Sequence, residues 1–116
     1  MNILKSLFGG SGAGVVSASE AKSLLDSGTP PFVLDVREPS EYTSGHIAGA
    51  TLVPLGQLEA RMNELPKDRQ IICVCASGGR SSMATQKLAK AGYDVVNLRG
   101  GMMGWQMEKY PIQKGN

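Results

Sequence analysis

The sequence is poor in cysteine and histidine, and this scarcity excludes several classes of protein. Only two of its 116 residues are cysteines and one is a histidine. The two cysteines, Cys73 and Cys75, are separated by a single valine. In an extended strand their Cα atoms lie roughly 6.5–7 Å apart, at the limit for a disulfide. We therefore expect reduced thiols and a cytoplasmic protein, and not a disulfide-stabilised secreted domain.

Net charge and long apolar runs are also lacking. The formal charge is only +2 at pH 7, with acids and bases interspersed along the chain, so no basic patch points to nucleic acid or an anionic membrane. No segment approaches the roughly 18 apolar residues of a membrane span. Residues 1–8 are too short for a signal peptide. We expect a flexible extension over residues 1–14 and one compact domain over residues 15–116.

What the sequence does contain is an alternation of short strand-like and helix-like segments. Apolar runs predict strands at 32–36, 50–53, 71–75 and 94–98, after a short apolar stub at 15–16. Helical patterns begin at Ser17 and cover 38–44, 55–65, 80–91 and a short segment after 100–101. This alternation predicts an α/β domain with a mainly parallel sheet and helices on both faces. Asp35 and Cys75 stand at strand ends, where such sheets bind ligands.

The segment after Cys75 has the composition of an anion-binding loop. Cys75 ends the most apolar strand, and the turn 76–79 leads into the helix that begins near Arg80. Gly78 and Gly79 permit positive φ, so that successive backbone N–H groups can face a common point. The helix N-terminus and Arg80 add positive charge. We therefore predict that the pKa of the Cys75 thiol lies below its usual value and that the thiolate is a nucleophile.

Three blocks of the sequence resemble the signatures of the rhodanese family, in the family's order. They are LDVREPSEYTSGHIAGA (34–50), IICVCASGGRSS (71–82) and GGMMGW (100–105). The resemblance covers roughly residues 15–112, nearly the whole chain. It implies a small α/β domain with a five-stranded, mainly parallel sheet, and no metal or organic cofactor.

The resemblance also implies a reaction. Cys75 matches the cysteine that takes a sulfane sulfur from a donor such as thiosulfate, holds it as a persulfide and passes it to cyanide or a thiol, a protein thiol included. The residues expected to surround the sulfur are Ala76, Ser77, Gly78, Gly79, Arg80 and Ser81. Asp35 and Arg37 are expected to support this loop. We expect no nucleic-acid partner, and a monomer or weak dimer.

Other conspicuous residues have plainer interpretations. Cys73 lies inside the predicted strand and favours core packing, with a resolving thiol as the alternative. His46 favours a hydrogen-bonded structural role over a catalytic base. Glu41 stands one helical turn from Arg37, which predicts a local ion pair. Trp105 favours the core or a pocket wall.

Two functions from other classes stay open at this point. The first is a phosphatase or arsenate reductase. Cell-cycle phosphatases of related fold use five residues between cysteine and arginine, whereas four separate Cys75 from Arg80, and this shorter loop resembles the sulfurtransferase version. Rhodanese-like domains can also serve as non-catalytic binding modules, although those lack the cysteine. A sulfur carrier needs the same persulfide as a free-standing enzyme, so the sequence does not distinguish the two. It also leaves the physiological donor and acceptor open.

Overall fold

The computed structural model describes residues 14–116. Its elements are β1 (Gly14–Val16), α2 (Ala18–Leu25), β2 (Phe32–Asp35), α3 (Pro39–Ser44), β3 (Thr51–Leu52), the 3-10 turn η1 (Leu55–Gln57), α4 (Leu58–Arg61), the 3-10 turn η2 (Met62–Glu64), β4 (Ile71–Val74), α5 (Gly79–Lys90), β5 (Val95–Leu98) and α6 (Gly101–Met107). The expected extension falls on residues 1–13, outside the described residues, apart from Gly14, which begins β1. Within residues 14–116, no helix has the length and apolar content needed to cross a bilayer.

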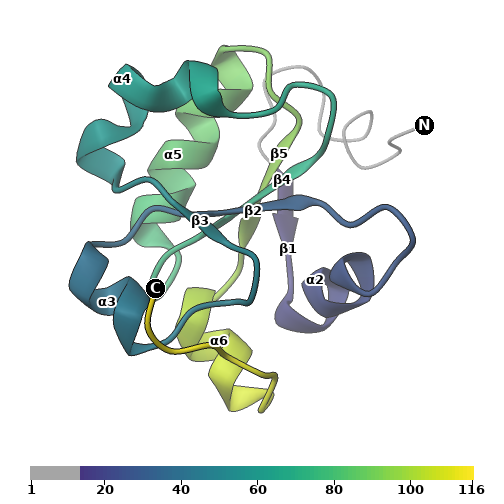
Figure 1. Ribbon diagram of the computed structural model, residues 1–116. Coiled ribbons are helices and arrows are strands. Elements are labelled where there is room, and N and C mark those ends of the chain that lie inside the picture. Colours follow the sequence, from purple (N-terminus) through teal and green to yellow (C-terminus); the bar gives the residue numbers. More distant parts are fainter. Residues whose placement is uncertain (1–13) are drawn as a thin grey trace.

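The five strands form one sheet in the order β1-β5-β4-β2-β3. All four pairings are parallel (Figure 1). The predicted α/β class and five-stranded sheet are therefore confirmed. β4 occupies the centre, with Cys73 opposite Leu34 on β2 and Asn97 on β5. The loop after β4 consequently emerges at the middle of the sheet's carboxyl edge, where neighbouring strand ends can supply supporting groups.

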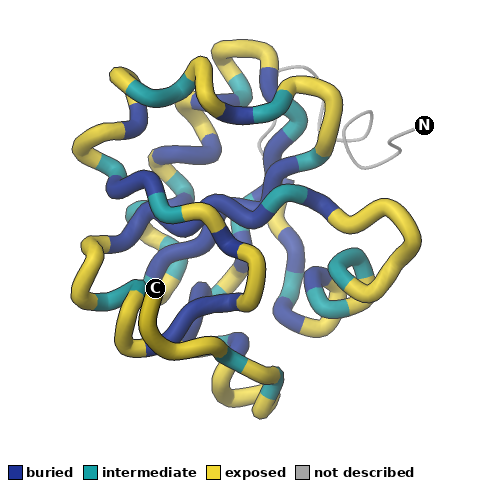
Figure 2. The backbone as a smooth tube through the Cα atoms, in the orientation of Figure 1, coloured by how far each residue is buried: buried dark blue, intermediate teal, exposed yellow. Residues whose placement is uncertain are grey.

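Helices cover both faces of the sheet, and the alternation along β4 fits this arrangement. Ile72 and Val74 pack in the cluster that includes residues of α2 and α6. Ile71 and Cys73 pack on the opposite face with residues of α4 and α5, and Cys75 joins the same cluster. Because successive strand side chains point to opposite faces, both thiols lie under α5. Figure 2 shows the central strands as a continuous buried layer.

The predicted capping box at the start of α2 is confirmed. The Glu20 amide donates to Ser17 Oγ (3.1 Å), and the Ser17 amide donates to Glu20 Oε1 (2.8 Å). The reciprocal bonds satisfy two amides that the helix itself leaves unpaired. A second box opens α3, where the Glu38 amide donates to Glu41 Oε1 (2.9 Å). This bond holds the Glu41 side chain at the amino end of α3.

The single helix expected over residues 55–65 is wrong. The segment instead forms η1, the four-residue helix α4 and η2. Leu58 and Leu65 are buried as the helical spacing predicts. The backbone tightens to 3-10 turns at the two ends, which contain Gly56 and Asn63, both weak helix formers.

Candidate active site

The loop between β4 and α5 curls around the sulfur of Cys75. Gly78 is the N-cap of α5, with φ +112°, a left-handed conformation that favours glycine. A Cβ at Gly78 would meet no atom closer than 3.6 Å, so the backbone angle and not space requires glycine there. In this conformation the Gly78 amide donates to Cys75 Sγ at 3.0 Å. The turn residue thus directs its N–H at the sulfur.

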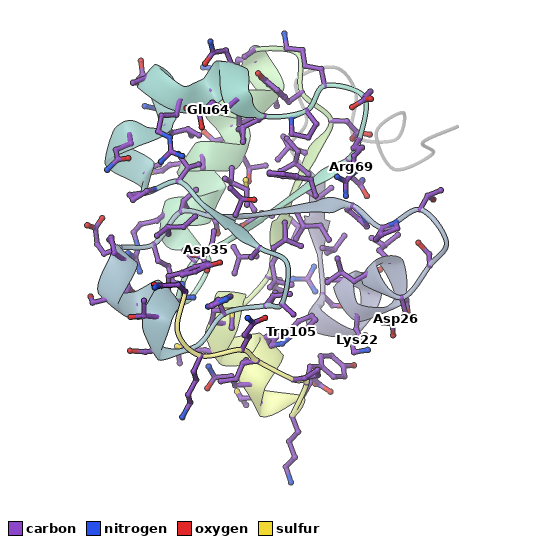
Figure 3. All side chains as sticks on the ribbon, in the orientation of Figure 1. Lys22, Asp26, Asp35, Glu64, Arg69 and Trp105 are labelled. Atoms are coloured by element: carbon purple, nitrogen blue, oxygen red, sulfur yellow. The ribbon has the colours of Figure 1, made fainter. Side chains whose placement is uncertain are left out.

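The amino end of α6 fixes the same loop from outside. The Met102 amide donates to the Cys75 carbonyl (2.8 Å) and the Met103 amide to the Ala76 carbonyl (3.0 Å). At Gly101, a Cβ would lie only 2.3 Å from the Cys75 carbonyl oxygen, so the close approach needs glycine. Trp105 is buried and donates from Nε1 to the Pro111 carbonyl (2.8 Å); Figure 3 labels it beside α6. The GGMMGW motif therefore fixes the cysteine loop through backbone hydrogen bonds. Trp105 belongs to the hydrophobic core.

The environment of Cys75 stabilises a thiolate. Burial raises the pKa of the thiol, but hydrogen bonds from Ser81 Oγ and from the amides of Ser81, Gly78 and Ser77 together outweigh it, so that the pKa lies below the ordinary value. The Ser81 hydroxyl is 3.3 Å from Sγ. Donors that converge on a charged form favour that form. The expected lowering is thus confirmed.

Cys73 has the opposite environment. Its side chain is fully buried, and desolvation raises the pKa of the thiol to about 12 despite a hydrogen bond with Thr85. A thiol with this pKa holds its proton at neutral pH and is a poor nucleophile. The core-packing interpretation of Cys73 therefore fits the structure better than a resolving thiol.

Arg80 does not project freely toward the sulfur loop. Its Nη1 donates to Glu41 Oε1 (2.7 Å) and its Nη2 to Glu41 Oε2 (2.8 Å), which joins α5 to α3. The Arg80 guanidinium, and then the Glu38 amide, lower the pKa of the Glu41 carboxyl to about 2. The predicted ion pair between Glu41 and Arg37 is wrong, because Arg37 is engaged elsewhere.

Asp35 and Arg37 form a buried ion pair at the carboxyl end of β2, where Figure 3 labels Asp35. Arg37 Nε and Nη2 donate to the two carboxylate oxygens of Asp35 at 2.9 and 2.7 Å. Arg37 Nη2 also donates to the Gly45 carbonyl (2.8 Å) just after α3. These bonds hold α3, and α3 presents Glu41 to Arg80. The pair is therefore connected to the cysteine loop through α3 and the Glu41–Arg80 ion pair.

The comparisons with known proteins agree with this geometry. The model of the Rhodanese-like domain family matches residues 17–108. The chain belongs to the rhodanese-like family. A "Sulfurtransferase" of Allochromatium vinosum is 41% identical over 82 residues, which are 70% of this chain and 77% of that protein. The "Putative sulfur carrier protein YrkF" of Bacillus subtilis is 41% identical over 91 residues; the match covers 78% of this chain but only 49% of that relative.

The fold of this rhodanese-like domain also matches solved structures. A rhodanese-related protein of Thermoplasma volcanium superposes with a TM-score of 0.81 at 31% identity, covering 86% of this chain and 97% of that one. The family membership, the all-parallel sheet and the sulfurtransferase names of the relatives agree with one another. They support sulfur transfer in general and leave the donor and acceptor to be argued from the site.

In this rhodanese-like domain His46 is structural. Its Nδ1–H donates to the Tyr42 carbonyl (2.7 Å), and its ring stacks on the Tyr42 ring with centroids 3.7 Å apart. The His46 backbone pairs with Gln113 through two hydrogen bonds of 2.9 and 2.7 Å. These bonds tie the C-terminal segment to the chain just after α3. Only 2% of His46 is exposed, which fits a structural role.

Sequence reasoning missed Asn97. Its Oδ1 accepts from Ser81 Oγ (2.6 Å), and its Nδ2 faces the Gly78 carbonyl (3.3 Å). Asn97 therefore contacts two of the residues that donate to the sulfur. A hydroxyl has one proton, so Ser81 shares it between Asn97 and Cys75. The available signal was a polar residue inside an otherwise apolar strand run next to the Cys75 strand.

The two thiols are expected to differ sharply toward a small alkylating reagent. Iodoacetamide should label Cys75 at a rate that rises with pH and reaches half its plateau below pH 9.0, the ordinary pKa of the group. Cys73 should stay unlabelled in the folded chain and react only after denaturation. Mass spectrometry of fragmented peptides measures both rates. Equal labelling of the two thiols in the folded protein would contradict the environments described above.

Proposed function

We propose that Cys75 takes the sulfane sulfur of a small donor such as thiosulfate, carries it as a persulfide and passes it to cyanide or a thiol. The observation that best supports this proposal is the convergence of hydrogen-bond donors on Cys75 Sγ. A thiolate is the form that attacks sulfur. The same donors can bind the negative charge of a persulfide after the attack. The sulfurtransferase name of the Allochromatium relative supports this chemistry.

The first step balances as a displacement at sulfur. The Cys75 thiolate attacks the outer sulfur of thiosulfate, a new S–S bond forms, and the bond between the two thiosulfate sulfurs breaks. Its electron pair leaves with sulfite. The product is Cys75–S–S⁻, so total charge is conserved. In the second step an acceptor thiolate or cyanide attacks the terminal sulfur, and the Cys75 thiolate leaves as the cradled anion.

Burial of the sulfur bears on the acceptor. Cys75 is only 1% exposed, whereas the loop residues Ser77 and Gly79 above it are exposed. A persulfide places the reactive atom about 2 Å further from the strand, one S–S bond length. The outer sulfur can therefore be reached by a thiol that could not reach Cys75 itself. We infer that a protein thiol is a suitable acceptor, which fits the carrier name of the Bacillus subtilis relative.

The test is the mass of the intact chain before and after thiosulfate. We expect a gain of one sulfur atom, located on Cys75 by fragmentation, and its complete removal as thiocyanate on addition of cyanide. The loaded chain should also transfer its sulfur to a reduced protein thiol. Failure to gain sulfur from thiosulfate, polysulfide or an alkyl persulfide would overturn the sulfur-transfer function.

A further inference from the structure

The one arginine of the cysteine loop is already occupied. Both Nη groups of Arg80 are bound by the two oxygens of Glu41, at 2.7 and 2.8 Å. The geometry is the bidentate arrangement in which a guanidinium binds a planar anion most strongly. A sulfonate or sulfite oxygen that needs the same edge of Arg80 must displace Glu41 or use the remaining N–H groups. Glu41 is therefore an internal competitor for the donor's anionic group.

The competitor is held in place and ionised. The Glu38 amide donates to Glu41 Oε1, and the guanidinium and this amide keep the pKa of Glu41 near 2. The carboxylate is therefore charged at every pH at which the thiolate could react. Two further facts point the same way: Arg37 is neutralised by Asp35, and Glu38 adds negative charge near Arg80. The positive field that a dianion would need is largely cancelled at this edge of the loop.

We propose that Glu41 determines which sulfur donors the site prefers, by disfavouring donors whose leaving group is a dianion relative to alkyl persulfides. This inference rests on the function proposed for Cys75. The backbone N–H groups around the sulfur do not contact Glu41, so they can still donate hydrogen bonds to a terminal sulfur. Only the binding of the donor's charged remainder depends on Arg80.

The two donor classes differ in the charge that leaves. From thiosulfate, the S–S bond breaks and sulfite departs with the electron pair as a dianion. From a persulfide R–S–SH, the Cys75 thiolate attacks the terminal sulfur and a new S–S bond forms. The S–S bond of the donor breaks, and its electron pair leaves with R–S⁻, which carries one charge, while Cys75–S–SH forms. With Arg80 neutralised by Glu41, departure of the singly charged R–S⁻ is favoured over departure of the sulfite dianion. A free Arg80 would reverse this advantage, because a planar cation favours an oxyanion.

Glu41→Gln is the decisive variant, because the amide keeps an oxygen for the Glu38 N–H and removes the charge. The measured quantity is the ratio of kcat/KM for thiosulfate to kcat/KM for the persulfide of 2-mercaptoethanol. We expect this ratio to rise about fivefold to tenfold in the variant, an effect the size of one partly exposed charge. An unchanged ratio, or a falling one that would mark Glu41 as a holder of Arg80 for the donor, overturns the proposal.

The chain offers a matched control in a second carboxylate that pairs with α5. Glu59 accepts from Lys87 Nζ at 2.7 Å, so Glu59→Gln also removes one carboxylate paired with α5, and it lies away from the loop. Its ratio should equal that of the unmodified chain. If Glu41→Gln fails to fold, salt dependence of the unmodified chain serves instead. With Arg80 neutralised, kcat/KM for thiosulfate should stay level or rise with ionic strength, and a steep fall contradicts the proposal.

The outcomes also separate this inference from the function on which it rests. If neither donor loads sulfur onto the unmodified chain, the persulfide function fails. If both donors load Cys75 but Glu41→Gln leaves their ratio unchanged, the function stands and only the role of Glu41 is wrong.

Discussion

A Cys75→Ser chain is expected to gain no sulfur from thiosulfate or a persulfide and to lose transfer to cyanide by about a thousandfold or more. The serine hydroxyl is far less acidic than a thiol, so the donors that converge on the Cys75 sulfur have no anion to stabilise. It also cannot form a persulfide. The fold should survive, because serine is similar in size and the Gly78 and Ser81 donors can bond its oxygen. Intact mass and thiocyanate release measure the loss.

Cys73→Ser is the matched control, since it makes the same change two residues earlier in the same strand. Cys73 is fully buried and its pKa of about 12 keeps it protonated. Sulfur loading of this variant should stay within about threefold of the unmodified chain, because a residue outside the reaction affects it only through packing. Thr85 can bond the new hydroxyl, which limits the cost in stability. If sulfur loading required Cys73, the assignment of the persulfide to Cys75 would be wrong.

Local sequence patterns were sufficient for most of the fold. The apolar runs around Phe32, Ile71 and Val95 became β2, β4 and β5 within one or two residues of the expected ends. The Ser17–Glu20 pair formed its box. These features depend on neighbours in the sequence, so periodicity and capping rules detect them. The segment 55–65 failed because weak helix formers at its ends tightened the turns, which apolar spacing alone does not reveal.

The site shows the same division between local and distant information. The Gly78 turn and its bond to Cys75 follow from the loop sequence. The partner of Arg80 does not, because Glu41 is 39 residues away on another helix and becomes a neighbour only after the sheet assembles. A rule of i, i+4 spacing assigned Glu41 to Arg37 instead. Asn97 was missed for the same reason: its contacts with Ser81 depend on the pairing of β4 with β5.

The largest expected effect on stability comes from Arg37→Met. The Asp35 carboxylate is only 1% exposed, and the variant removes the side-chain hydrogen bonds that Arg37 donates to it. Of the bonds from residue 37, only that from the backbone amide (3.1 Å) remains. Removing one partner of a buried pair costs about 3–5 kcal/mol, because the remaining charge has no compensation. Against the roughly 5–15 kcal/mol that stabilises a typical domain, this is a substantial share. Urea unfolding followed by circular dichroism measures the change.

Two further variants separate the cost of an orphaned charge from that of lost contacts. Asp35→Leu combined with Arg37→Met removes both charges, and should recover much of the loss because apolar groups can replace a buried pair. Lys22→Met breaks the exposed Lys22–Asp26 pair and should cost less than about 1 kcal/mol. If the double variant were as unstable as Arg37→Met, the main contribution of Arg37 would be its bond to the Gly45 carbonyl. Anchoring of α3, and with it of Glu41, would then outweigh charge compensation in the role of this pair.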